Sequence, residues 1–335
     1  MNIKKVIKIV TVVFVISFFV LWGIFSNYVG SPVDFQDRQF TVEIPKGTSF
    51  SIASGILEEL DLIKQKKLFY FLAVLEDAPE HIRAGEYELR SSMTPEEILE
   101  KLLKGKIKGY HIPIPEGFTV RQIAARLSAW RLVNEDKFIT LASDRDFLRS
   151  LDIPGNSAEG YLFPDTYIFN KSMGEKEIIK CMARQFRQKV TPEMIKRAGD
   201  LGFTMEEIIT LASIIEKEGG LKEEKPLVAA VFHNRLKKRM RLQSDPTVIY
   251  DIENFNGNIT KKDLIRRTPY NTYRIKRLPP GPICNPGIDA ISAALFPAQV
   301  SYLYFVSKND GSHHFSSNLV SHNKAVVKYQ IKRKK

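Results

Sequence analysis

Cysteine is almost absent from this chain: Cys181 and Cys284 are the only two in 335 residues, and they form no C-x-x-C pair. So few cysteines exclude a cysteine-rich zinc site and a disulfide scaffold. One bridge between them stays open, because sequence alone does not give their separation. The histidines form no H-E-x-x-H motif, and adjacent His313 and His314 would point to opposite faces of a strand, so we predict no metal site.

The common nucleotide and nucleophile motifs are also missing. The chain contains no P-loop, no G-x-G-x-x-G and no G-x-S-x-G. Lys217 lies in no motif that would mark a Schiff-base lysine. These absences argue against ATP, NAD or PLP chemistry and against a serine hydrolase, so we predict that the protein needs no cofactor.

Basic residues outnumber acidic ones, which gives the chain a formal net charge of +12. Such a charge suits nucleic acid, anionic lipid or a polyanionic wall polymer, and it also serves solubility alone. No zinc-finger spacing and no RNP-like aromatic pattern occurs, so we predict no nucleic-acid partner.

The N-terminus carries the one long apolar run. Lys4, Lys5 and Lys8 precede it, and Asp34 is the first charged residue after it. The run is long enough to span a bilayer, whereas a cleaved signal, the alternative, usually has a shorter apolar region and an A-x-A site. We predict a cytoplasmic segment 1–8 and a transmembrane helix 9–29 in the cytoplasmic membrane. Lysines on the cytoplasmic side would leave the rest of the chain outside the cytoplasm.

The next stretch, 38–108, reads as a small α+β module. Residues 40–44 and 86–90 alternate as strands, and two helical segments lie between them. Thr94 is a helix cap with Pro95 at the first helical position, and Gly105 ends that helix.

A strand, an I-P-x-G turn and a helix occur twice, at an offset of 70 residues. Residues 44–47 read IPKG and residues 114–117 read IPEG, and the apolar positions that follow also match. The pattern indicates an internal duplication, unless two β-turn-α units resemble each other by chance.

Residues 109–335 form the remaining domain, which we predict to be mixed α/β. Helices are expected over 138–148, 175–189, from Thr191, over 204–220, 226–239, 290–295 and 322–329. Residues 302–307 and 314–316 are expected to form a hairpin across the turn Asn309-Asp310-Gly311. The fold class of the whole chain is therefore α+β.

The helix over 204–220 organises this domain. Thr204 and Glu207 match a capping box, and an apolar series fills the helix. Glu216 and Glu218 close it, about 200° apart around the axis, so both cannot reach one cleft. A carboxyl group held against apolar surroundings has the raised pKa that a proton donor needs, although a surface carboxylate near a helix end is the commoner case.

Polar and aromatic side chains crowd the loops around this helix. Aromatic faces suit sugar rings, and amides and hydroxyls suit their hydroxyl and acetamido groups, although core packing and loop capping explain such residues equally well. The candidate substrate-binding residues are Tyr161, Phe163, Asp165, Gln243, Ser244, Asp245, Tyr270, Asn271, Asn285 and His314.

The chain resembles the endolytic murein transglycosylases, the YceG-like family, over nearly its whole length. The resemblance rests on EGYLFPDTY (159–167), LASIIEKE (211–218), LQSDPTVIY (242–250), YNTY (270–273), LPPGPICNPG (278–287), YLYFV (302–306) and HHFSSN (313–318). It implies that the module 38–108 is LysM-like, that 109–335 is catalytic, and that Glu216 is the catalytic residue, with Glu218 structural or tuning Glu216.

The family resemblance also implies the reaction. A lytic transglycosylase cuts the MurNAc–GlcNAc β-1,4 bond of nascent peptidoglycan strands without water, leaving a 1,6-anhydro end and ending strand elongation. Peptidoglycan synthases are then the expected neighbours, in a periplasm if an outer membrane exists. Two alternatives stay open: a hydrolytic muramidase using Asp165 or Asp245 as a second carboxylate, and a non-catalytic wall-binding scaffold.

Overall fold

The computed structural model describes residues 3–77, 82–252 and 255–331, and the chain divides into two compact units. Unit 1 contains residues 1–110 and 168–172, and unit 2 contains residues 111–167 and 173–335. The ends of the predicted segments 1–8 and 109–335 lie outside the described residues. Helices and strands are both present, as predicted.

Unit 1 begins with α1 (Ile3–Gly30), a helix of 28 residues with no buried residue. It is long and apolar enough to cross a membrane, and it contains the whole predicted span 9–29. Only its end contacts the rest of unit 1, where Phe25, Tyr28 and Val29 pack against the core.

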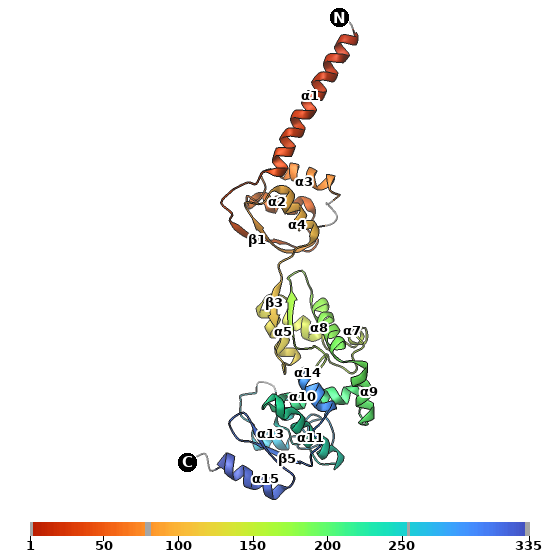
Figure 1. Ribbon diagram of the computed structural model, residues 1–335, viewed down its shortest axis with the longest axis vertical. Helices are drawn as coiled ribbons and strands as arrows, with labels where there is room; N and C mark the ends of the chain where they lie inside the picture. Colours follow the sequence, from red (N-terminus) through yellow and green to blue (C-terminus); the bar gives the residue numbers. More distant parts are fainter. Residues whose placement is uncertain (1–2, 78–81, 253–254, 332–335) are drawn as a thin grey trace. The chain divides into compact units, whose positions relative to one another are not determined.

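The rest of unit 1 is a β-α-α-β-α module (Figure 1). Its elements are β1 (Gln39–Ile44), α2 (Phe50–Glu59), α3 (Lys66–Leu75), β2 (Gly85–Arg90) and α4 (Pro95–Lys104). β1 and β2 pair antiparallel, with Val42 opposite Tyr87. Leu57, Phe69 and Tyr87 are fully buried between the sheet and the helices. The predicted cap of α4 is confirmed, since Thr94 and Glu97 form a capping box and Gly105 is left-handed.

The internal repeat extends to the backbone angles. Gly47 and Gly117 both have positive φ, of 80° and 76°. The residues after the two helices match as well, since Asp61 and Arg131 have φ of 52° and 56°. Non-glycine residues seldom adopt such angles, so the strand, turn and helix recur as one backbone unit.

Unit 2 opens with short helices around one pair of strands. β3 (Tyr110–Pro113) pairs with β4 (Thr166–Phe169), and the division between the units falls inside both strands. The helices are α5 (Val120–Ala129), α6 (Glu135–Leu141), α7 (Arg145–Arg149), α8 (Glu175–Lys189) and α9 (Pro192–Asp200). The single helix predicted over 138–148 is wrong: Asp144 caps a new helix by accepting from the Phe147 amide at 2.7 Å.

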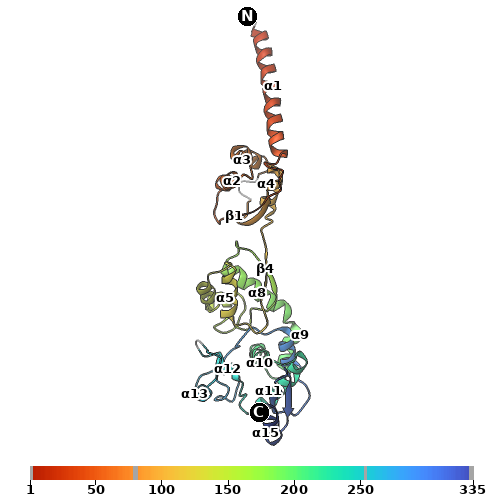
Figure 2. The same ribbon diagram turned by 90° about the vertical axis from the view of Figure 1, so that its left-hand side faces the viewer.

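The helical core of unit 2 surrounds α10 (Met205–Glu218), which packs against α14 (Ile288–Leu295) and α11 (Lys225–Lys237) (Figure 2). Residues 208–215 of α10 are all buried, which the apolar series in the sequence requires. A 3-10 turn (Lys222–Glu224) precedes α11, and α12 (Asp245–Ile249) and α13 (Lys261–Ile265) follow it.

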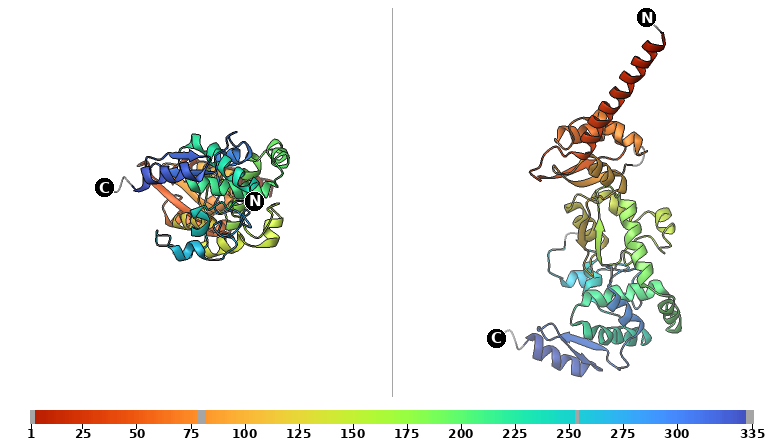
Figure 3. Two further views of the ribbon diagram at one scale, coloured as in Figure 1. Left: turned by 90° about the horizontal axis from the view of Figure 1, so that it is seen from below. Right: turned by 45° about the horizontal axis from the view of Figure 1, so that its top comes forward.

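The chain ends in the predicted hairpin and helix. β5 (Tyr304–Ser307) pairs antiparallel with β6 (His313–Ser316), and α15 (Leu319–Val326) lies beside them (Figure 3). A π-helical turn (Val327–Ile331) completes the described chain. Each sheet described in the structure has two strands.

Candidate active site

The candidate site lies at the C-terminal end of α10. Its N-terminus is fixed by the predicted capping box, in which Thr204 and Glu207 exchange hydrogen bonds of 2.8 and 3.1 Å. At the other end, Gly219 and Gly220 have φ of 72° and 90° and turn the chain away. A helix buried along its length and fixed at both ends holds Glu216 and Glu218 in defined positions.

Glu218 lies in surroundings that favour its protonated form. Ser244 Oγ donates to Glu218 Oε1 at 2.5 Å. Burial raises the pKa of Glu218 to about 7, the Ser244 hydrogen bond and Arg235 oppose the rise, and the negative charge of Asp245 adds to it. The residue as a whole is intermediate between buried and exposed. Its place at a helix C-terminus, where the dipole disfavours an anion, acts in the same direction.

Glu216 faces a different set of partners. Lys225 Nζ donates to its two carboxylate oxygens at 2.9 and 3.1 Å, and the Gly287 amide donates to Oε2 at 3.1 Å. Both side chains of the ion pair are only about a tenth exposed, at 10% and 9%. Three hydrogen bonds, two of them from a charged donor, therefore hold the Glu216 side chain in place.

The turn formed by residues 114–117 lies against this ion pair. Glu116 Oε2 lies 3.7 Å from Lys225 Nζ, and burial and the neighbouring Glu216 raise the pKa of Glu116. The Gly117 amide donates to the Asn285 carbonyl at 2.9 Å, and Lys217 Nζ donates to the Gly117 carbonyl at 3.4 Å. A Cβ on Gly117 would lie 3.5 Å from Glu216 Cγ, so this turn covers one side of the helix end.

Five of the ten predicted binding residues are buried, with exposed fractions of 6% or less: Tyr161, Phe163, Ser244, Asn271 and Asn285. Asn285 accepts from the Gly160 and Leu162 amides at 2.9 Å each. Asn271 donates to three backbone carbonyls at 2.6 to 3.2 Å. The polar atoms of both asparagines are thus used within the protein.

The other five candidates keep surface open to a ligand. Gln243 and Asp245 are exposed, and Asp165, Tyr270 and His314 are partly exposed. Gln243 has φ of 50°, a left-handed angle that residues other than glycine seldom adopt. Asp245 accepts from Tyr273 Oη at 2.6 Å and influences Glu218, whereas Asp165 accepts from Gln185 at 2.6 Å.

Two side chains of the candidate site could not be predicted from the sequence. Lys225 is one of them, because only the fold shows that it pairs with Glu216. Glu159 begins the aromatic motif, and it accepts hydrogen bonds from the Val120 amide, from Asn285 and from Tyr250 at 3.0 to 3.4 Å. Burial raises the pKa of Glu159 to about 8.

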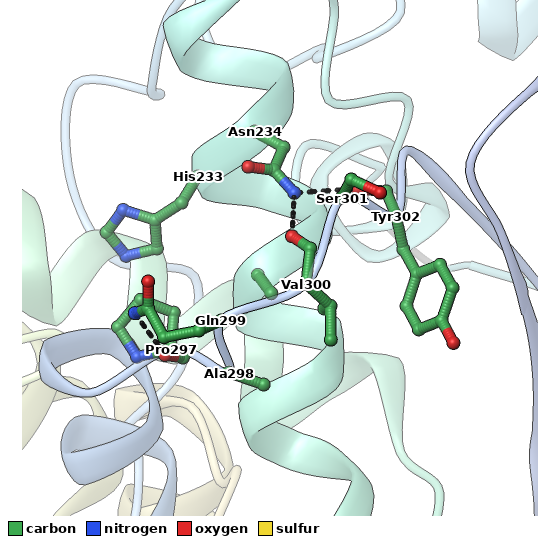
Figure 4. Close-up of a pocket in the computed structure, with 9 residues that line it drawn as sticks. His233, Asn234, Pro297, Ala298, Gln299, Val300, Ser301 and Tyr302 are labelled. Carbon is green, nitrogen blue, oxygen red and sulfur yellow. Dashed lines mark hydrogen bonds between the residues drawn. The ribbon is translucent and has the colours of Figure 1, made fainter.

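A pocket of about 590 Å³ lies elsewhere on unit 2, between α11 and residues 297–302 (Figure 4). Asn234 Nδ2 donates across it to the Val300 and Tyr302 carbonyls at 2.8 and 2.9 Å. Its lining includes His233 but no carboxylate, so we do not assign the chemistry to it. Among the described residues no cluster of three His, Cys, Asp or Glu side chains could hold a metal.

Three comparisons identify similar proteins. The model of the YceG-like family matches residues 42–328. The chain is 36% identical to a Bacillus subtilis protein named endolytic murein transglycosylase, over 89% of this chain and 87% of that one. It is 30% identical to a Streptococcus pneumoniae protein of the same name, over 94% of this chain and 65% of that longer one. The crystal structure of a YceG-like protein from Listeria monocytogenes, 34% identical, covers 87% of this chain and all of that one with a TM-score of 0.60.

Proposed function

The chain belongs to the YceG-like family, and we propose that it is a lytic transglycosylase that cuts peptidoglycan glycan strands internally, between MurNAc and GlcNAc. The names of the relatives support the enzyme class. The environment of Glu218, with Ser244 as its donor and Asp245 as a negative neighbour, is the observation that carries the chemistry. Burial there raises the pKa of Glu218 to about 7, which lets it donate a proton near neutral pH.

We propose Glu218, rather than the predicted Glu216, as the proton donor. Lys225 and Gly287 already hold both carboxylate oxygens of Glu216 in hydrogen bonds within the protein. Glu218 has one donor, Ser244, and a negative neighbour, Asp245. The Glu216–Lys225 pair is then a positioning element that keeps the helix end rigid. The prediction for Glu216 is not yet tested.

The proposed reaction uses one carboxyl group twice. Protonated Glu218 donates its proton to the glycosidic oxygen, the C1–O bond breaks, and GlcNAc leaves with a free hydroxyl. The C6 hydroxyl of the same MurNAc attacks C1, and the Glu218 carboxylate accepts the proton that this hydroxyl releases. The product has a 1,6-anhydro end, and Glu218 is protonated again. Ordinary glycosidases need a second carboxylate for water or for C1, but here the nucleophile belongs to the substrate.

A hydrolytic muramidase is the alternative that the site still allows. Asp245 lies beside Glu218 and is exposed, so it could direct a water molecule. The two reactions leave different ends, which mass spectrometry of digested peptidoglycan separates. Reducing ends in place of anhydro ends would support hydrolysis and contradict our proposal.

The decisive experiment compares two matched variants of the full-length protein in detergent. Glu218→Gln should lose 10²- to 10⁴-fold in the rate of anhydro-end formation, about the contribution of a general acid. Glu216→Gln should keep activity within about tenfold at a temperature where it is folded. The reverse pattern would restore Glu216 as the acid, and full activity of both would place the acid at another residue. Failure of the wild type to form anhydro ends would support a non-catalytic scaffold.

Location completes the proposal. α1 would span the cytoplasmic membrane with Lys4, Lys5 and Lys8 inside, so the catalytic unit acts on new strands at the outer face, beside the synthases. The unit 1 module would bind glycan in the manner of LysM domains. Cleavage of the new strand by unit 2 at the outer face of the membrane would terminate its elongation. Protease accessibility of unit 2 in spheroplasts tests the orientation.

A further inference from the structure

One surface segment holds much of the charge of the protein. Residues 261–277, here called the basic segment, contain seven basic side chains and one acidic one. Their net charge of +6 is half of the +12 that the whole chain carries. The basic side chains are Lys261, Lys262, Arg266, Arg267, Arg274, Lys276 and Arg277, and all seven are exposed.

This charge has no partner within the described protein. Ion pairs form elsewhere in the described chain, but none includes a basic side chain of this segment. The one acid, Asp263, caps α13 by accepting from the Thr260 amide and hydroxyl at 2.9 and 2.6 Å. Seven exposed cations in 17 residues create a positive potential that attracts anionic ligands.

The segment is held in a fixed conformation. Asn271, 1% exposed, donates to the carbonyls of Asp263, Leu264 and Arg266 and so ties α13 to the loop that follows it. The capping box at Thr260 fixes the start of α13. The backbone around α13 is thus in place before a ligand arrives, which lowers the entropy cost of binding.

The same segment is linked to the candidate acid through Ser244. Thr272 Oγ1 accepts from the Ser244 amide at 2.9 Å, and Ser244 Oγ donates to Glu218. The next residue, Tyr273, donates to Asp245 at 2.6 Å. A glycan strand bound at Glu218 would therefore run beside the basic segment.

We infer that the basic segment binds the carboxylates of the peptide stems carried by the glycan strand, so that the enzyme selects strands with anionic stems over peptide-free glycan. This inference rests on the proposed function. A sugar backbone of GlcNAc and MurNAc offers hydroxyls and amides, whereas each stem adds carboxylates that exposed lysine and arginine side chains can pair with. Charge complementarity and continuity with Glu218 favour this ligand over a membrane surface.

The test variant is Arg274→Gln/Lys276→Gln/Arg277→Gln in the full-length protein. Its control is Lys180→Gln/Arg184→Gln/Lys196→Gln, which removes three exposed charges of unit 2 from α8 and α9. On stem-bearing strands the test variant should raise KM about tenfold with kcat unchanged, because each exposed pair contributes a few-fold. The control should change KM less than twofold. Arg274→Lys/Arg277→Lys, which keeps the charge, should restore the wild-type KM.

Two further substrates complete the experiment. With peptide-free strands, or strands whose stem carboxylates are amidated, wild type and test variant should have equal KM. Raising NaCl from 50 to 300 mM should increase the wild-type KM on stem-bearing strands more than that of the test variant.

Three outcomes would overturn the inference: no difference between test variant and control, an equal loss on peptide-free strands, or loss of binding to phosphatidylglycerol vesicles with KM unchanged. The last outcome would assign the segment to lipid. Failure of the wild type to form anhydro ends from any strand would instead refute the proposed function.

Discussion

The pH dependence of the reaction is the sharpest consequence of the site. A general acid must be protonated in the free enzyme, so kcat/KM should be level at low pH and fall above the pKa of Glu218, about 7. At pH 6 about nine tenths of the enzyme would hold the proton, and at pH 8 about one tenth. We expect kcat/KM to fall about tenfold between these two values.

Two substitutions should move the falling limb of this kcat/KM–pH profile in opposite directions. Ser244 donates to the ionised form, so Ser244→Ala should shift the limb to higher pH. A hydrogen bond to a charged group contributes about 1.5 kcal/mol, which corresponds to about one pH unit. Asp245→Asn removes a negative neighbour and should shift the limb to lower pH, by about half a unit, because Asp245 is exposed and its charge is screened.

The assay is initial-rate release of anhydro ends from purified strands between pH 5 and 9, at constant ionic strength. Asp200→Asn is the control, since Asp200 is an exposed carboxylate at the end of α9. Its limb should coincide with that of the wild type. A rate that does not change between pH 6 and 8, or a shift of both variants in the same direction, would refute the assignment of Glu218.

Three further predictions concern stability. Burial raises the pKa of Glu159 to about 8 and the unfolded residue titrates near 4.5, so stability should fall by on the order of 4 kcal/mol across that window. Glu159→Gln should leave the smaller slopes of Glu218 and Glu116, whose pKa values are also raised, as urea unfolding at pH 5 and 9 would reveal. Gly160→Ala should cost more than about 2 kcal/mol, because φ is 88° and the new Cβ would lie 2.5 Å from Pro282; an unchanged Tm would contradict this. Lys225→Met should cost about 3–5 kcal/mol by leaving Glu216 buried and unpaired, and adding Glu216→Gln should recover most of that loss.

Local chemistry made much of the fold predictable. Thr94, Thr191 and Thr204 are helix caps that the sequence identifies within one turn, and each accepts the expected backbone hydrogen bond. The helix over 175–189 and the hairpin near 304–316 follow from periodicity and turn residues in the same way. The break at Asp144 was missed because an apolar pattern continues across two short helices.

The site was harder to predict because its partners come from distant segments. Helical geometry placed Glu216 and Glu218 on opposite sides of α10, which their separate partners confirm. Which side holds Lys225 and which holds Ser244 depends on how later segments fold back on the helix. Polar residues in loops posed the same difficulty: Asn271 and Asn285 look like ligand-binding amides in sequence but serve the backbone.

The repeated I-P-x-G turn is under different constraints in its two occurrences. In the first copy a side chain on Gly47 would meet nothing within 4 Å, so only the backbone angle limits what evolution can place there. In the second copy Gly117 lies against Glu216 and bonds to the Asn285 backbone. We expect the first turn to vary among relatives and the second to stay fixed, because the second turn packs against the end of α10 that carries Glu216.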